Sequence, residues 1–381
     1  MSKVVIVQRV LPHYRVPFFD ALHNQLRLHG VNLLVLYGQE KKGSVPATVK
    51  GSWPWAKYKR NEYLELFGRE LVWQPCLGEC RNADLIIVEQ ANRLLLNYLL
   101  IARRAIVNCS KLAYFGHGKN FQREDKSGFN SFNEMIKQFL LNSSDWWFAY
   151  TSLSAKYILE EGVSKDKLTT LDNTIDSSLI KLEPGGAVLG VDVDFVKNKY
   201  GIKSNSVGLF CGGMYANKRL SFLIDACKRV KNKVPNFEMI FIGSGPDQYL
   251  VEDACSKYSW MHYAGPAYGK EKAALFEISR IILMPGLVGL VVVDSFVSER
   301  PMVTSNISYH SPEISYLEHA RNGWIAEDDV GDYSHSAIRI LTEPSLESVL
   351  KNGCRISAQK YTMENMVEKF SSGILQCLGK C

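Results

Sequence analysis

The sequence predicts an α/β protein with two doubly wound domains in series, and three observations support this fold class. The chain has 381 residues, enough for two domains of about 150–200 residues with separate cores. Short β-forming runs alternate with helical patterns throughout, which is typical of parallel sheets covered by helices. Pro184-Gly185-Gly186 opens a weakly patterned stretch that indicates a linker. We therefore expect an N-terminal domain over 1–184, a C-terminal domain over 185–362 and a tail helix over 363–381.

Most of the expected strands are continuously apolar, as is typical of strands buried on both faces of a sheet. In the first half these strands are Lys3–Val7, Val31–Tyr37, Asp84–Glu89, Lys111–Phe115 and Trp147–Thr151. In the second half they are Val207–Cys211, Phe237–Ile242, Met261–Tyr263, Arg280–Met284 and Pro301–Thr304. Apolar residues recur with helical spacing over Arg219–Lys233 and Met363–Leu378, which predicts two amphipathic helices.

The composition is that of a globular protein, because 46% hydrophobic and 22% charged residues exclude bulk disorder. The net charge of +6 is mild and the basic residues do not cluster on one element, so we expect no nucleic-acid partner. The N-terminal apolar run is too short for a signal peptide, and Ile281–Val297 is interrupted too often to span a membrane. The nine cysteines lack the spacing of a zinc site, so we expect no metal. Their odd number, with no secretory signal, indicates reduced thiols in a cytoplasmic protein.

Glycines follow three expected strands of the second half, at the positions where doubly wound sheets bind their ligands. These strands end at Cys211, Ile242 and Met284. The residues after them that we expect to bind a nucleotide are Gly212, Gly213, Gly243, Ser244, Gly245, Gly286, Val288, Gly289 and Leu290. Lys218 lies one turn after the first pair, and Asp294 lies near the start of the apolar helix that follows the last loop.

These residue types suit a nucleoside diphosphate. Glycine lets backbone N–H groups at a helix N-terminus approach the phosphates closely, and a lysine adds a positive charge. A carboxylate one turn into the helix can accept two hydrogen bonds from ribose hydroxyls. Each feature alone also occurs as an ordinary turn, a solvated lysine or a helix-start carboxylate. Their order after successive strands of one domain indicates a nucleotide site.

Two loops of the first half carry further candidates. A loop between two prolines contains His13, Tyr14 and Arg15, which we expect to bind an acceptor, although polar surface residues beside a helix start would give the same pattern. The strand Lys111–Phe115 is followed by His117, which stands between two glycines. A histidine in this setting is exposed at the strand end rather than packed, which favours a functional role.

The second half resembles the retaining GT-B glycosyltransferases of the large family 4 over nearly its whole length. The family pattern G-R-L-x-x-x-K-G is similar to residues 212–219 and places Lys218 on the phosphate-binding lysine. The pattern G-x-G-P matches residues 243–246, and F-x-G-x-V, whose loop meets the nucleotide base, is similar to residues 263–267 with Tyr268 adjacent. The pattern P-S-x-x-E-G-F-G-L-x-x-L-E-A aligns with the segment from Gly286 through Ser295. A last run, E-I-I-x-x-G-x-N-G-x-L-V, is similar to residues 311–329 and places Glu313, Asn322 and Gly323.

Three of the chain's departures from the family pattern concern the residues that would contact the donor. Gly213 stands where the first pattern has arginine, Gly286 replaces the first glutamate of the E-x7-E motif, and Asp294 replaces the second. The resemblance implies that the first glutamate contacts the donor sugar and the second the ribose. We therefore expect ribose binding by the shorter Asp294 and no sugar contact from position 286.

The resemblance implies a GT-B protein, with two Rossmann-like domains that face a central cleft and a tail helix that crosses back to the N-terminal domain. It implies transfer of a sugar, with retention, from a nucleotide-sugar donor to a glycan or lipid-linked acceptor, as in the synthesis of a bacterial O-antigen or capsule. His117 resembles the family's histidine beside the donor sugar, so the expected catalytic residues are His117, Lys218 and Asp294. The implied reaction needs no metal or other cofactor.

Other functions stay open on the sequence alone. A GT-B sugar-nucleotide epimerase would share the nucleotide-binding half but should carry more carboxylates and histidines across the cleft. A non-catalytic nucleotide-sugar-binding subunit is favoured by the glycine at position 286. A nicotinamide dehydrogenase is disfavoured because no G-x-G-x-x-G follows the first strand.

Two segments of the first half could make further contacts, the first of them with the inner face of a membrane. Asn92–Arg104 combines leucines with arginines and could rest on anionic lipid, or could be an ordinary buried helix. A second segment has aromatic and basic residues that could contact a lipid-linked or polymeric acceptor, or form a surface loop. Its residues are Trp53, Trp55, Lys57, Lys59 and Arg60.

Overall fold

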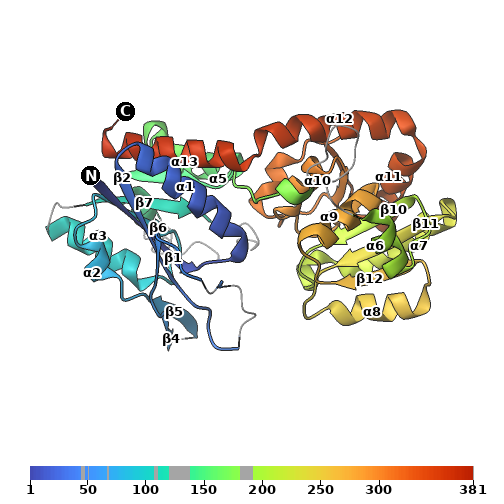
Figure 1. Ribbon diagram of the computed structural model, residues 1–381, viewed down its shortest axis with the longest axis horizontal. Helices are drawn as coiled ribbons and strands as arrows, with labels where there is room; N and C mark the ends of the chain where they lie inside the picture. The colour runs from blue at the N-terminus through green and yellow to red at the C-terminus, as the bar shows by residue number, and fades with distance from the viewer. Residues whose placement is uncertain are drawn as a thin grey trace. The chain divides into compact units, whose positions relative to one another are not determined.

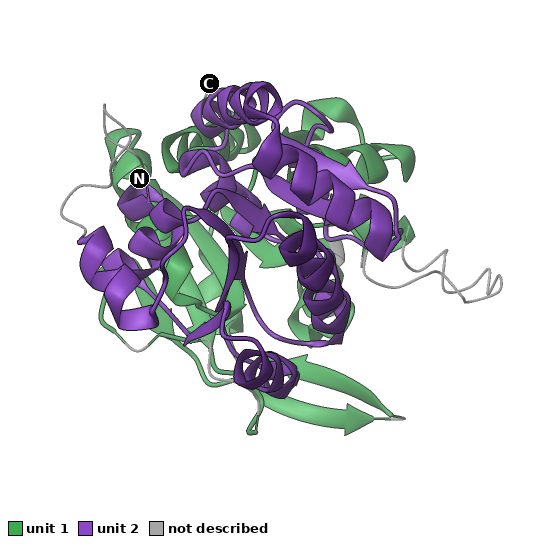
Figure 2. Ribbon diagram, turned by 90° about the vertical axis from the view of Figure 1, so that its right-hand side faces the viewer, with its two compact units in different colours: residues 1–120, 125–176, 362–381 green, residues 121–124, 177–361 purple. Residues whose placement is uncertain are grey.

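The computed structural model describes residues 1–43, 48–49, 51–66, 68–106, 110–119, 138–180 and 192–380. They form two compact units (Figure 2). Unit 1 contains the described residues up to Asp176 together with the C-terminal segment from Thr362, and unit 2 contains those from Ser177 to Tyr361. The expected linker glycines at 185 and 186 lie outside the described residues.

Unit 1 is built on a parallel seven-stranded sheet in the order β3-β2-β1-β6-β7-β8-β9 (Figure 1). The strands are β1 (Ser2–Val10), β2 (Val31–Gly38), β3 (Ala56–Tyr58), β6 (Leu85–Glu89), β7 (Lys111–Gly116), β8 (Trp146–Ala149) and β9 (Leu168–Thr170). An antiparallel pair, β4 (Glu62–Leu66) and β5 (Arg69–Trp73), forms a separate hairpin. The strand order reverses at β1, which lies between β2 and β6.

Helices cover both faces of this sheet. They are α1 (Val16–Leu28), α2 (Leu77–Cys80), α3 (Leu95–Ile106), α5 (Ser152–Glu160) and α13 (Met363–Leu378), and a 3-10 turn η1 (His13–Arg15) precedes α1. Alternate residues of β1 enter two different cores: Val4 and Ile6 pack with α1 and α13, whereas Val5 and Val7 pack with α3 and α5. This alternation explains why the strand is apolar at every position.

The tail helix belongs to unit 1 and lies along α1 (Figure 1). Phe370 of α13 is fully buried, and its ring stacks on Phe148 of β8 with centroids 4.3 Å apart. Thr362 caps the start of the helix by accepting a hydrogen bond from Asn365 N, and Gly379 ends it in the left-handed conformation.

Unit 2 is built on a parallel six-stranded sheet in the order β12-β11-β10-β13-β14-β15. The strands are β10 (Ser206–Cys211), β11 (Phe237–Ile242), β12 (Met261–Gly265), β13 (Ile281–Leu283), β14 (Met302–Ser305) and β15 (Gly323–Ala326). The helices are α6 (Val193–Tyr200), α7 (Leu220–Lys233), α8 (Gln248–Lys257), α9 (Gly269–Ile278), α10 (Val291–Val297), α11 (Val330–Thr342) and α12 (Pro344–Lys360). Two more 3-10 turns of this unit matter for the site, η4 (Ala216–Lys218) and η5 (Pro312–Tyr316). The strand order reverses between β10 and β13.

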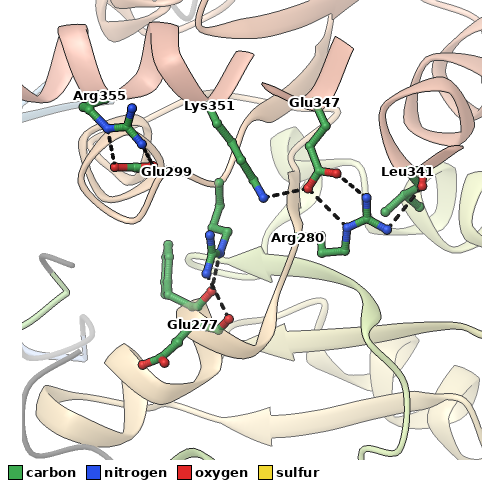
Figure 3. Close-up of polar contacts among 9 residues, drawn as sticks. Glu277, Arg280, Glu299, Leu341, Glu347, Lys351 and Arg355 are labelled. Atoms are coloured by element: carbon green, nitrogen blue, oxygen red, sulfur yellow. Dashed lines mark hydrogen bonds and ion pairs between the residues drawn. The ribbon is translucent and has the colours of Figure 1, made fainter. Parts of the chain in front are cut away.

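Polar contacts hold the end of this sheet at which β13 and β14 begin (Figure 3). Arg280, directly before β13, forms hydrogen bonds with the carboxylate of Glu347 and with the carbonyl oxygen of Leu341. Glu347 also pairs with Lys351 at 2.8 Å. Arg300, just before β14, donates to two backbone carbonyls of α9 at 3.2 and 3.1 Å. These contacts attach α9 and α12 to the sheet. The glycine loops lie at the opposite end of the strands.

All the strands expected from the sequence are present, so the predicted α/β fold of two doubly wound units is confirmed. The strand expected over Trp147–Thr151 ends at Ala149, because Thr151 caps α5. The sequence analysis missed β3, β4, β5, β9 and β15. These strands are short, and β3, β9 and β15 lie at sheet edges, where a long apolar run is not required.

The aromatic-basic segment at 53–60 is partly core and partly surface, since Lys57 and Arg60 are exposed. Trp55 is fully buried, and its indole N–H donates to Asp20 at 2.6 Å. Lys57 and Lys59 both pair with Glu79. The tryptophans therefore belong to the core beside α1 rather than to a contact surface, and an acceptor contact of this segment stays a prediction for its exposed residues alone.

The leucine-rich segment Asn92–Arg104 contains most of α3, which is a core helix with one exposed side. Leu96 and Leu100 are buried against the sheet, whereas Tyr98 and Leu99 are exposed. None of the helices in the described part of the chain is long and apolar enough to cross a membrane.

Candidate functional site

Three glycine loops meet where the strand order of unit 2 reverses, and backbone hydrogen bonds join them. The loop after β10 bonds to the loop after β11, because Met214 N donates to Ser244 O at 2.9 Å. It also bonds to the loop after β13, because Leu287 N donates to Asn217 O at 3.0 Å. The loops that the sequence predicts separately are therefore one continuous surface at the carboxyl ends of the strands. This is the place where an open α/β sheet binds its ligand.

Close packing between these loops explains two of the glycines. A Cβ atom on Gly243 would stand 1.9 Å from Gly212 O, and one on Gly245 would stand 2.2 Å from Met214 O. The φ angle of Gly243, +130°, is also one that only glycine adopts without strain. Gly213 instead lies beside the ring of Tyr215.

Lys218 lies inside this surface. Its side chain is buried, and its ammonium group donates to the carbonyl oxygen of Leu287, in the loop after β13. Burial lowers the pKa of Lys218 to about 8, although Cys211 and Glu313 act in the opposite direction. A buried cation held by a backbone carbonyl is stabilised by any anion that reaches it. Lys218 is therefore suited to bind a phosphate.

Arg219 occupies the position at which the family pattern has glycine. Its φ angle is +58°, in the left-handed region that glycine adopts most easily. The guanidinium group stacks on Phe222, 4.3 Å from the ring centroid, and forms an ion pair with Asp328. These contacts compensate for the backbone strain and direct the charge of Arg219 to Asp328.

No side chain fits at position 286. A Cβ atom on Gly286 would lie 2.1 Å from Asn217 O and 2.7 Å from Lys218 Cα. The structure therefore explains why position 286 has glycine and not the glutamate of the family pattern, because the loop after β13 packs directly against η4. Gly289, three residues later, meets nothing within 4 Å of its Cβ position.

His310 holds the same loop from the other side. Its Nε2 donates to Ser305 O at 2.7 Å, and its Nδ1 accepts from Val288 N at 3.4 Å. Burial lowers the pKa of His310, in keeping with a neutral ring that both donates and accepts. The sequence analysis did not single out His310. Val288, which it expected at the donor, uses its N–H in this contact.

Asp294 is buried in the first turn of α10, with both carboxylate oxygens engaged. Oδ1 accepts from Ser177 Oγ at 2.8 Å, and Oδ2 forms an ion pair with Lys272 Nζ at 2.6 Å. Lys272 comes from the first turn of α9 and was not predicted as a site residue. The carboxylate of Asp294 is therefore paired with a lysine and a serine hydroxyl.

Tyr268 stands at the N-cap of α9 and is 69% exposed. Tyr263, which lies in β12 five residues before Tyr268, donates from its hydroxyl to Gly243 O at 2.9 Å. The segment that resembles the family's base-binding loop is thus tied to the glycine loop after β11.

In unit 1, His117 follows β7 as expected and is partly buried. Its Nδ1 lies 3.5 Å from Ser154 Oγ, and its ring meets Tyr150 edge-on with centroids 4.4 Å apart. Gly118 has a φ angle of +79° and no room for a Cβ atom beside Ile158. The glycine after His117 is therefore required by the turn.

The three residues expected to bind an acceptor form η1, and they differ in exposure. Arg15 is buried, and its guanidinium donates to Asn173 at 2.7 Å. Four aromatic rings surround that guanidinium at 5.5–5.9 Å, those of Tyr14, Phe18, Phe115 and Tyr150. This environment favours a structural role for Arg15. Tyr14 is 36% exposed, and His13 packs against its ring.

Among the described residues, no group of three or more His, Cys, Asp or Glu side chains is placed to hold a metal ion. Cys76 and Cys80 are buried, and burial raises the pKa of their thiols to about 12 and about 11. These cysteines are part of the core of unit 1.

Comparison with known proteins places the glycine loops in a known family segment. Residues 205–343 match the family described as Glycosyl transferases group 1. The alpha-monoglucosyldiacylglycerol synthase of Acholeplasma laidlawii is 22% identical over 200 residues, which cover 50% of this chain and 49% of that enzyme. The chain therefore spans about half the length of this curated relative.

Solved structures match over almost the whole chain. HepE of Anabaena, crystallised in complex with UDP, superposes with a TM-score of 0.70 at 14% identity and covers 98% of this chain and 99% of its own. A glycosyltransferase of Rickettsia africae gives 0.70 at 13% identity, with 100% and 99% covered. The chain has the GT-B fold. Its two Rossmann-like units are the two domains of that fold.

Proposed function

We propose that the protein is a glycosyltransferase that moves a sugar from a nucleoside diphosphate donor to an acceptor. The observation that carries the proposal is Lys218, buried within three joined glycine loops where the sheet of unit 2 reverses its strand order. These loops lie inside the segment that matches Glycosyl transferases group 1. The UDP bound by HepE, a protein of the same fold, supports a nucleotide donor.

The chemistry follows from charge. When the bond between the sugar and the diphosphate breaks, negative charge grows on the leaving phosphate, and a preorganised cation lowers the energy of that state. We assign this role to Lys218, together with the backbone N–H groups of Gly289 and Leu290. The same preorganisation supports a reaction with retention and without a metal ion, in which the donor's own phosphate receives the acceptor proton.

The proposal also gives roles to Asp294, in donor binding, and to His117, at the reacting sugar. Steady-state kinetics can separate these roles. Asp294→Asn should raise the donor KM, because a donor contact that is equal in the ground and transition states changes only binding. His117→Ala should lower kcat, because a group at the reacting sugar acts mainly as charge develops. Steady-state kinetics on both variants tests this split. A pure KM effect for His117→Ala would make it a binding residue, and unchanged kinetics for both would remove the two assignments.

For the acceptor we propose a glycan or a lipid-linked glycan, as in bacterial surface polysaccharide synthesis at the inner face of the cytoplasmic membrane. The lipid product named for the Acholeplasma relative supports a lipid-linked acceptor. Leu64 and Leu66, on one face of β4, are 50% and 53% exposed and offer apolar surface for a peripheral membrane contact.

Titration calorimetry with UDP, GDP and ADP, with and without a chelator, tests the donor class. We expect one nucleoside diphosphate to bind without divalent metal, followed by transfer from one of its sugar derivatives. NMR of the product then gives the anomeric configuration. Strict dependence on magnesium or manganese would contradict the metal-free mechanism, and no binding of any nucleotide would contradict the proposal as a whole.

Gly286 favours one alternative, a non-catalytic nucleotide-sugar-binding subunit, because it leaves position 286 without a side chain for the donor sugar. The two functions differ in turnover. A protein that binds a nucleotide sugar but releases no nucleoside diphosphate in the presence of acceptors would fit the binding subunit.

A further inference from the structure

Two lysines from different elements contact the segment that leads from the loop after β13 into α10. Lys218 comes from η4 and Lys272 from α9. Burial raises the pKa of the Cys211 thiol to about 11, and both lysines act against this rise. Both lysines also contact one segment of the chain, since Lys218 Nζ donates to Leu287 O and Lys272 Nζ lies 2.6 Å from Asp294 Oδ2.

Lys272 is held but not fully enclosed. Its Nζ lies 2.6 Å from Asp294 Oδ2, and its side chain is 22% exposed, whereas that of Asp294 is 3% exposed. An ammonium group has three N–H donors, and this ion pair leaves capacity for a second acceptor. Burial disfavours the charge of Lys272, but Asp294 and Cys211 outweigh burial and raise the pKa, so Lys272 is a cation at neutral pH.

A nucleoside diphosphate needs more positive charge than Lys218 alone supplies. The next position of the loop, Gly213, has no side chain, and the following cation, Arg219, is engaged with Asp328. Lys272 of α9 pairs with Asp294, in the helix that follows the loop to which Lys218 donates. It presents a cation whose orientation is fixed by a buried carboxylate.

We propose that Lys272 is a second phosphate-binding cation of the nucleotide site, with Asp294 orienting its ammonium group. The proposal rests on the proposed function, since it assumes a nucleoside diphosphate at the glycine loops. It assigns to Asp294 a positioning role in addition to any contact with the ribose.

A purely structural role makes a different prediction. Asp294 is buried, and a buried carboxylate requires a counter-ion, so loss of Lys272 lowers stability in either case. A structural role disturbs the whole site, including the part that binds the nucleoside. A phosphate contact is lost only by ligands that carry phosphate.

The test compares Lys272→Met, Lys272→Arg and the matched control Lys270→Met, an exposed lysine of the same helix. Affinities are measured by calorimetry for the nucleoside diphosphate that the wild type binds, and by competition for the corresponding nucleoside. For Lys272→Met we expect the diphosphate to bind about 10–100-fold more weakly, the effect of one charge-assisted hydrogen bond, with nucleoside affinity unchanged. Lys272→Arg, which retains the charge, should restore most of the affinity, and Lys270→Met should equal the wild type.

Two results would overturn the proposal. Equal losses for diphosphate and nucleoside would show that Lys272 acts only through the shape of the site, and unchanged diphosphate affinity would remove it from the site. Thermal unfolding of each variant identifies any that has lost its fold, and Lys272→Arg then serves as the folded comparison. A wild-type protein that binds none of the nucleoside diphosphates rejects the proposed function itself and this inference with it.

Discussion

At the scale of single residues, the site combines groups whose ordinary behaviour has been changed by burial. Lys218 and His310 both have a pKa below its usual value, chiefly because each is removed from water. They touch adjacent residues of one loop, since Lys218 donates to Leu287 O and His310 accepts from Val288 N. One side chain can bind the ligand while the other fixes the backbone around it.

Lys218→Ala should lower kcat/KM for sugar transfer by about 10–1000-fold, because a cation aimed at a leaving phosphate stabilises the transition state. Steady-state kinetics with saturating acceptor measures the loss. Lys233→Ala, at the exposed end of α7, is the control and should behave as the wild type. If the two variants had equal kcat/KM, Lys218 would have only a packing role.

His310 should make stability depend on pH. Its pKa is lower in the folded protein than the ordinary value of 6.5, so the unfolded chain binds its proton first as pH falls. The stabilisation is complete above about pH 6.5 and is lost as pH falls through the folded pKa. We expect the free energy of unfolding to fall between pH 7.5 and 5.5, and to fall less steeply in His310→Gln. Denaturant unfolding across this range checks the difference, and parallel curves would exclude His310 as its source.

At the scale of elements, the loop between β13 and α10 is the part of unit 2 that departs most from the family pattern. It has glycine at position 286, where the family pattern has glutamate, and it lies against η4 with no space for a side chain at that position. A later substitution that restored the glutamate would have to move the backbone at Asn217 or Lys218. The loop and η4 therefore depend on each other, because neither can change alone.

Gly286→Ala should lower the melting temperature and weaken nucleotide binding, because a Cβ atom 2.1 Å from Asn217 O forces the two loops apart. The cost expected for such overpacking is about 1–3 kcal/mol of unfolding free energy. Gly289→Ala is the matched control for stability alone, since nothing in the protein lies within 4 Å of its Cβ position, whereas its N–H belongs to the proposed phosphate site. Differential scanning fluorimetry and calorimetry measure both effects. A Gly286→Ala protein as stable as Gly289→Ala would show that the loop is not packed as described.

At the scale of the whole molecule, the chain builds unit 1 from both of its ends. α13 completes the core that α1 and the sheet begin, whereas unit 2 is continuous from Ser177 to Tyr361. Because the chain enters and leaves unit 2 through unit 1, the last helix contributes to a domain that is otherwise encoded before residue 177. Loss of this helix would expose the face of the sheet that α13 covers.

Phe370→Ala should lower the free energy of unfolding of unit 1 by about 3–5 kcal/mol, the usual cost of removing a buried aromatic ring. The ring is fully buried against Phe148, Phe18 and Phe115. Gln376→Ala, on the exposed side of the same helix, should change stability by less than about 0.5 kcal/mol. Chemical denaturation of the full chain measures both values. Equal stability of the two variants would mean that α13 does not hold unit 1 together in solution.

The sequence by itself determined the two α/β units and the positions of their main strands along the chain. Apolar runs such as Val207–Cys211 predict buried strands because burial on both faces requires apolar residues at every position. It also located Lys218 and the glycine loops, because the ends of successive parallel strands must lie at one edge of a sheet. The spacing of apolar residues and the positions of strands along the chain are local properties, so they can be seen directly in the sequence.

Only the tertiary structure decided which side chains surround those loops. Lys272 and His310 lie 22 residues from their partners Asp294 and Val288, and Ser177 lies 117 residues from Asp294, with no local pattern to link them. Burial likewise distinguished Arg15, enclosed by aromatic rings, from the exposed Tyr14 beside it. A residue's type shows which contacts it can make, but its partners and its exposure to water depend on how distant segments pack, and these set its charge and its role.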